Sequence, residues 1–151
     1  MQLAHYIGLL HRSQCDLGEA FREVGSAHAD EADVFHICQK LAKQCDRHGS
    51  ELQPFAERYG EDAPEEPDRL HGELFSGTRD GPIGLLRDLH DLYLMCALAD
   101  MAWTLIGQAA QGARDEALLR VVESCERETA TQMRWLRTRM KQAAPQALVV
   151  S

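Results

Sequence analysis

Residues 58–82, RYGEDAPEEPDRLHGELFSGTRDGP, interrupt an otherwise continuous helical pattern and decide the fold. Three of the five prolines and four of the eleven glycines lie in this stretch, which predicts a loop with room for one helical turn at 70–75. The connection is roughly 22 residues long, well beyond the two to eight residues usual between neighbouring helices of a bundle. At about 3.3 Å per residue it can run the length of a bundle, which favours a crossover over a functional or floppy loop.

The apolar residues on both sides of this loop recur three and four positions apart, which is the spacing of one face of an α-helix. Asp30 fits the N-cap of a second helix, and Pro82 fits the first position of a third. Gly112 and Pro145 mark where the third and fourth patterns end. We therefore expect four helices, at about residues 2–28, 31–58, 82–111 and 114–143.

Four helices of nearly equal length, each about 42 Å long, bury their apolar stripes most simply by packing together as a bundle. The short connections within each half of the chain predict two antiparallel hairpins. The predicted fold is thus all-α, with residues 1–151 forming a single domain in which a long crossover loop joins the two hairpins.

The charge and composition of the chain weigh against several classes of function. With 16 Lys and Arg against 24 Asp and Glu, the net charge of −8 opposes binding to nucleic acid or to a membrane surface. No run of 18 apolar residues predicts a membrane span, and His5 and His11 interrupt the apolar N-terminus in a way that is not typical of a signal peptide. Five cysteines without a C-x-x-C motif predict no disulfide framework, so we expect a cytoplasmic protein.

Polar or thiol side chains interrupt each apolar stripe near the middle of its helix. They are His11, Gln14, Cys15, Cys45, His48, Cys96, Asp100, Cys125, Glu128, Thr129 and Gln132. Because the midpoints of equal helices come to similar heights in a bundle, we expect these side chains to form one polar layer. His48 would then bond across the bundle to Asp100 or to Glu128, and such a network would fix the register of the helices.

This arrangement resembles the ferritin-like superfamily, whose metal-binding members carry Glu on two helices and Glu-x-x-His on the other two. Cys45-x-x-His48 and Cys125-x-x-Glu128 stand where the two Glu-x-x-His motifs would lie. The resemblance implies a mid-bundle site for iron, zinc or copper. Its candidate ligands are His48, Asp100, Glu128 and Cys45, with His11 or Glu19 from the first helix.

Two functions fit this polar layer. We favour a non-enzymatic interaction or oligomerisation module, a homodimer in which the layer sets helix register. The alternative is a divergent ferritin-like metal protein, and a thiol layer of Cys15, Cys45, Cys96 and Cys125 holding a soft ion such as Cu(I) is a variant of it. No nucleophile with an identifiable base, phosphate loop or dinucleotide motif indicates an enzyme.

Two further features receive structural interpretations. Gly18 and Gly25 lie on one side of the first helix, which indicates close approach of another helix, within the bundle or across a dimer interface. His28 is expected in an ordinary charged turn. His90, flanked by Asp88 and a second aspartate, is expected on a solvated helix face.

Overall fold

The computed structural model describes residues 2–60 and 75–150 and is all-α over that part of the chain. Its elements are α1 (Gln2–Ala27), α2 (Ala32–Gly60), α3 (Gly81–Gly112), α4 (Glu116–Pro145) and a short π-helical segment, η2 (Gln146–Val150). The four α-helices begin and end within two residues of the expected positions, which confirms the predicted four-helix bundle. The helical turn expected at 70–75 lies outside the described residues apart from Phe75, which is not helical.

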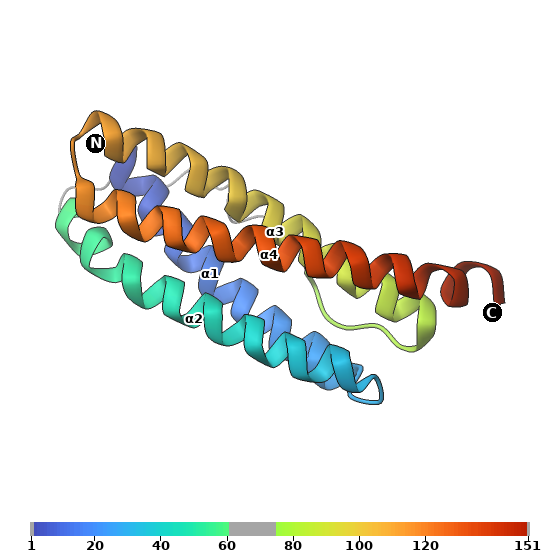
Figure 1. The fold of residues 1–151 in the computed structure, drawn as a ribbon. Coiled ribbons are helices and arrows are strands. Elements are labelled where there is room, and N and C mark those ends of the chain that lie inside the picture. The colour runs from blue at the N-terminus through green and yellow to red at the C-terminus, as the bar shows by residue number, and fades with distance from the viewer. Residues whose placement is uncertain (1, 61–74, 151) are drawn as a thin grey trace.

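The crossover connection is also confirmed. α1 packs along α2, and α3 packs along α4 (Figure 1). Near the end of α2, Tyr59 donates a hydrogen bond to Asp115 at the start of α4, 2.6 Å away. Just before α3, Arg79 bonds Asp88, which contacts His28 beside the α1–α2 turn. α2 therefore ends and α3 begins at opposite ends of the bundle, as the predicted crossover requires.

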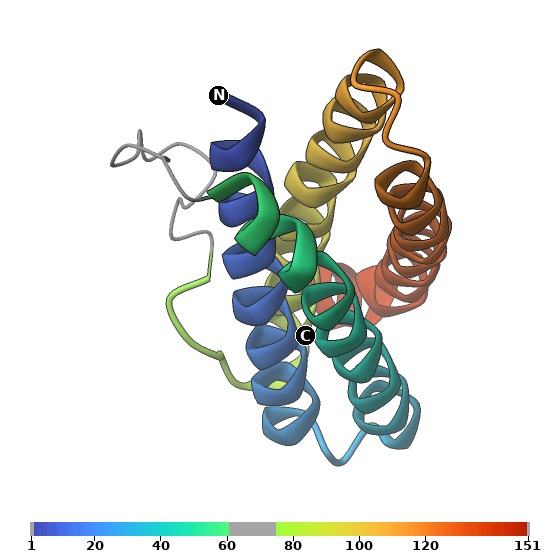
Figure 2. The same cartoon turned by 90° about the vertical axis from the view of Figure 1, so that its left-hand side faces the viewer.

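The two hairpins meet chiefly through α1 and α3, which pack against each other more extensively than α2 and α4 do (Figure 2). Within the first hairpin, two glycines of α1 allow α2 to pack closely against α1. A Cβ added at Gly25 would lie 3.0 Å from Cys38 Cβ, and one at Gly18 would lie 3.2 Å from Asp46 Oδ1. The close approach indicated by these glycines is therefore to α2 of the same bundle.

The apolar core consists of two clusters. Leu17 and Leu136 belong to the cluster nearer the α1–α2 turn, and Leu10 and Leu52 belong to the other. Fully buried polar side chains lie between the clusters, at Gln14, His48, Thr129 and Gln132. A polar layer at mid-height, as the sequence predicts, thus separates two apolar halves of the core.

The expectation that Pro145 ends the last α-helix is confirmed, and the short tail after it is π-helical. α4 includes Pro145 as its last residue. Proline has no N–H to donate and its ring clashes with the carbonyl four residues earlier, so it disfavours further α-helix, and the backbone continues as η2.

Candidate functional site

The polar layer is centred on His48 of α2, a side chain with no solvent exposure. Its Nδ1 lies 2.9 Å from Gln14 Oε1 on α1, and its Nε2 lies 2.9 Å from Glu128 Oε1 on α4. The ring of Trp103 on α3 packs edge-on against the His48 ring, with centroids 5.7 Å apart. His48 therefore contacts one residue on each of the other three helices.

Glu128 connects this buried layer to the surface. Its Oε1 accepts from His48 and also from Arg47, while 28% of its side chain is exposed. Burial acts to raise the pKa of Glu128, but the hydrogen bonds from Arg47 and His48 outweigh it and hold the pKa below the ordinary 4.5. The Glu128 carboxylate is therefore a stable acceptor at neutral pH.

The proton positions follow from which groups can donate. Burial lowers the pKa of His48 below its ordinary 6.5, although the bond to Glu128 opposes this shift, so the ring is neutral at neutral pH. A neutral imidazole has one N–H, and Glu128 only accepts, so Nε2 carries the proton. Nδ1 then needs a donor. The Gln14 amide supplies this donor if its NH₂ and oxygen exchange places. The Gln14 NH₂ group, which is buried and otherwise has no partner, then donates to His48 Nδ1.

Of the two partners expected for His48, the structure has Glu128 and not Asp100. Asp100 is partly buried and lines a surface groove between α3 and α4, together with Arg134 and Arg137. Burial raises the pKa of Asp100. Its position in this groove is a consequence of the rotation of α3, which turns Trp103 toward His48.

The remaining candidate ligands do not gather around His48 and Glu128. Cys45 is buried one turn away, His11 is partly buried, and Glu19 is exposed. Among residues 2–60 and 75–150, no three His, Cys, Asp or Glu side chains are placed to hold one metal ion. The donor set around His48 therefore does not fit a ferritin-like metal centre, which needs several carboxylates and imidazoles in one place.

The thiols do not form a layer from four helices because Cys15 is exposed. Two buried thiols instead share the amide of Gln132. Cys96 Sγ donates to Gln132 Oε1 at 3.7 Å, and Gln132 Nε2 lies 3.9 Å from Cys45 Sγ. Burial raises the pKa of Cys45 to about 12, which keeps this side chain in its thiol form.

A second polar cluster, which the sequence did not reveal, lies where the crossover reaches α3. Asp88 has no solvent exposure. Its Oδ2 accepts from His28 Nε2 at 2.8 Å and from the backbone N–H of Arg79 at 3.0 Å, and its Oδ1 accepts from Arg79 Nη1 at 2.8 Å. A Cβ added at Gly84 would lie 2.7 Å from the Arg79 carbonyl carbon, so glycine permits this close approach. Asp88 thus joins three segments of the chain.

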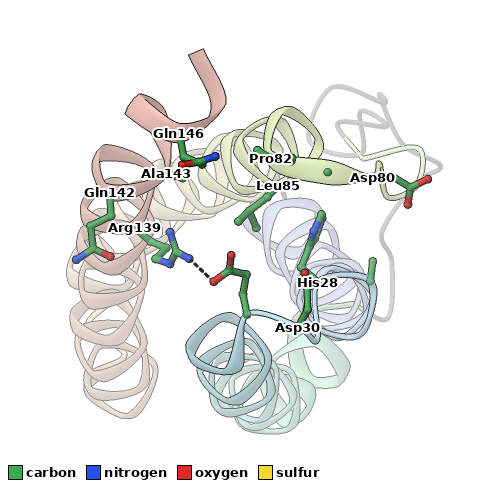
Figure 3. Close-up of a pocket in the computed structure, with 12 residues that line it drawn as sticks. His28, Asp30, Asp80, Pro82, Leu85, Arg139, Gln142, Ala143 and Gln146 are labelled. Carbon is green, nitrogen blue, oxygen red and sulfur yellow. Dashed lines mark hydrogen bonds and ion pairs between the residues drawn. The ribbon is translucent and has the colours of Figure 1, made fainter. Parts of the chain in front are cut away.

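His28 also lines a pocket of about 330 Å³ at this end of the bundle, with Leu85 from α3 and Arg139 from α4 (Figure 3). Arg139 turns toward the α1–α2 turn, where it pairs with Glu31 at 3.3 Å and with Asp33 at 2.7 Å. The charge of Arg139 therefore serves to join α4 to the first hairpin.

α3 carries a row of apolar side chains on the side opposite the core, which we call the α3 stripe. It consists of Leu94, Leu98, Met101 and Leu105. Leu94, Met101 and Leu105 are 40%, 58% and 46% exposed, and Leu98 is half-buried between them. Their spacings of four, three and four residues place them on one helix face. The sequence contains this signal, but it is hidden because α3 is apolar on most sides.

By length and composition alone α3 could cross a membrane, although no run of 18 apolar residues occurs. The core helix of a globular bundle meets the same criterion. Only 39% of the most apolar 18-residue window is buried, so much of this apolar surface faces outward.

Comparison with protein-family models, curated proteins and solved structures found no match to this chain. The ferritin-like superfamily thus remains a resemblance in connectivity.

Because the pKa of His48 is lowered in the folded protein, we expect the protein to lose stability as the pH falls. In the unfolded chain His48 titrates near 6.5, and in the folded chain it titrates lower. Between these two pH values the unfolded state binds more protons than the folded state does. The contribution of His48 to the free energy of unfolding is therefore complete above pH 6.5, and it decreases below pH 6.5 by at most about 1.4 kcal/mol per pH unit. Urea unfolding at a series of pH values would measure this slope. The lowered pKa of Glu128 adds a second loss that begins below 4.5.

The matched variant for this experiment is His48→Gln, which retains a polar side chain but has no titratable group. Its stability should fall less steeply than that of the unchanged protein just below pH 6.5. Equal slopes in the two proteins would show that His48 does not titrate on unfolding as described.

Proposed function

We propose that this chain is a non-enzymatic interaction module that forms a homodimer through the α3 stripe. The observation that carries the proposal is a continuous row of large apolar side chains in solvent, of which Met101 is the most exposed at 58%. Contiguous apolar side chains exposed on one helix face are a feature of interaction surfaces. A second copy that covers the stripe would remove these side chains from water.

The distribution of charge favours a second copy at this face. Two copies repel each other, because each carries a net charge of −8. Between residues 92 and 113 the only charged side chain is Asp100, which lies in the groove on the α4 side. Two copies that meet at the stripe would therefore bring no acidic side chains face to face there.

The His48 cluster has a defined role in this proposal. Because α3 is apolar on most sides, its apolar pattern alone does not select the face that turns inward. Trp103 lies on the side of α3 away from the stripe and packs against His48. We assign to this contact the task of holding α3 in the rotation that leaves the stripe exposed, which is the role of a specificity-giving polar network.

The metal-binding alternative has less support, because the geometry places only His48 and Glu128 together. Elemental analysis of freshly purified protein would test it. Near-stoichiometric iron, zinc or copper that is lost in His48→Ala would favour this alternative over the interaction module.

The proposal predicts that Met101→Glu gives a monomer. This change places a carboxylate in the middle of the apolar contact, once in each copy, and should raise the dissociation constant of the dimer by at least about 100-fold. Size-exclusion chromatography with light scattering would measure the mass. Because Met101 is 58% exposed, the helical circular-dichroism signal should not change.

Ser50→Glu is the matched control, because Ser50 is exposed on α2 and the change adds the same charge. This variant should remain dimeric. A Met101→Glu variant that associates as strongly as the Ser50→Glu variant would exclude the α3 stripe as the interface.

A further inference from the structure

The spacing of the residues in the α3 stripe is the same from either end of the helix. The spacings between Leu94, Leu98, Met101 and Leu105 are four, three and four residues, with the midpoint between Ala99 and Asp100. This is the spacing of a coiled-coil seam, in which apolar residues repeat every 3.5 residues and each side chain inserts among those of the facing helix. Two identical helices can pair through such a stripe in either the parallel or the antiparallel direction.

The residues that continue the seven-residue repeat distinguish the two directions. Toward the start of α3 the next positions are Arg87 and Asp91, and toward its end they are Gln108 and Gly112. A parallel pair would set Arg87 against Arg87 and Asp91 against Asp91. An antiparallel pair would set Arg87 against Gly112, which removes the contact between the two Arg87 side chains, and would set Asp91, which already pairs with Arg79, against Gln108. The antiparallel direction also pairs opposite ends of the two helix dipoles.

We propose that two copies of this chain pair antiparallel through α3, with Leu94 of each copy against Leu105 of the other and Leu98 against Met101. This inference rests on the proposed function, and it adds the direction, the register and the two-fold axis at the middle of the stripe. The symmetric contact is closed, because each stripe is fully used by one partner.

The size of the contact indicates a reversible dimer. The stripe spans twelve residues of helix, and its first and last residues lie about 17 Å apart along the helix axis. Four apolar side chains per copy are far fewer than the roughly 20–30 residues that each side of a standard-size complex contributes, so the association should be weak and transient. A repeat of 3.5 residues also implies that the two helices cross at about 20°.

Disulfide cross-linking tests the direction and the register. The background is Cys15→Ser, because Cys15 is the exposed cysteine among the five and the others are buried. Into it are placed Leu94→Cys, Leu105→Cys, or both, at positions that are 40% and 46% exposed. A disulfide needs Cα atoms within about 7 Å, whereas the two copies of position 94 in an antiparallel pair are offset by about 17 Å along the helix axis alone.

We expect the double variant to give a covalent dimer under mild oxidation, in at least about tenfold higher yield than either single variant. Cross-linking of each single variant to itself would show a parallel pair and overturn the inference while leaving the dimer intact. A dimer seen by light scattering without cross-linking in any variant would overturn the register.

Two results would instead count against the proposed function. The first is a monomer in the Cys15→Ser background at every concentration. The second is a monomer that binds phosphatidylcholine vesicles in a flotation assay, with this binding lost in the Met101→Glu variant. The stripe would then contact lipid and not a second copy.

Discussion

Asp88→Asn is expected to destabilise the protein by about 3 kcal/mol, because it breaks a buried hydrogen-bonded charge pair. Asp88 has no solvent exposure and accepts from His28 and twice from Arg79. Asparagine has nearly the same shape as aspartate, but an NH₂ donor replaces one of the two carboxylate oxygens. This NH₂ group would face N–H groups that also donate. Urea unfolding followed by circular dichroism would give the free energy of unfolding.

Asp91→Asn is the matched control. Asp91 also bonds Arg79 Nη1, at 2.9 Å, but 18% of its side chain is exposed and it has no contact with His28 among the described bonds. This variant should lose less than about 1 kcal/mol. If Asp88→Asn were no less stable than Asp91→Asn, the buried cluster would not hold the start of α3 as we describe.

His48→Ala is expected to destabilise the protein by about 3 kcal/mol, the sum of a cavity and of lost hydrogen bonds. The ring is fully buried against Trp103, so its removal leaves space that the packed helices cannot fill. Gln14 loses its partner in the buried layer, and Glu128 keeps Arg47. Thermal and urea unfolding would both record the loss.

His48→Leu separates the two causes of this loss. Leucine restores most of the volume but none of the hydrogen bonds, so it should recover part of the stability lost in His48→Ala. Full recovery would mean that the polar contacts of His48 contribute nothing. A loss below about 0.5 kcal/mol in His48→Ala would contradict the central packing role of the ring.

The helices and the crossover could be predicted because local signals specify them. Pro82 lies in the first turn of α3, one residue after the helix begins at Gly81, and the length of 58–82 requires a long connection. The mid-height layer could be predicted because His48 and Gln132 interrupt strongly amphipathic stripes, which fix the rotation of their helices.

The rotation of α3 could not be predicted in the same way. Since this helix is apolar on most sides, its sequence pattern fits several rotations almost equally well. The pattern therefore predicts Asp100 in the layer, whereas the structure has Trp103 there. The same ambiguity concealed the α3 stripe, because Leu94 and Met101 look like core residues in the sequence. Only packing against Trp103 and its neighbours reveals which side is exposed.

The Asp88 cluster had a signal that could have been used. Asp88 falls among Leu85, Leu89 and Leu92, which are buried, so it lies on the inward face of α3. A carboxylate at such a position requires partners. Its partners, His28 and Arg79, are distant in sequence or lie in the loop, so their identity depended on the crossover geometry.

Sedimentation equilibrium of the unchanged protein over a range of concentrations tests the central claim most directly. A reversible dimer requires a mass that rises from 16.9 kDa at high dilution to twice this value at high concentration. A mass that stays at 16.9 kDa at every concentration would contradict it.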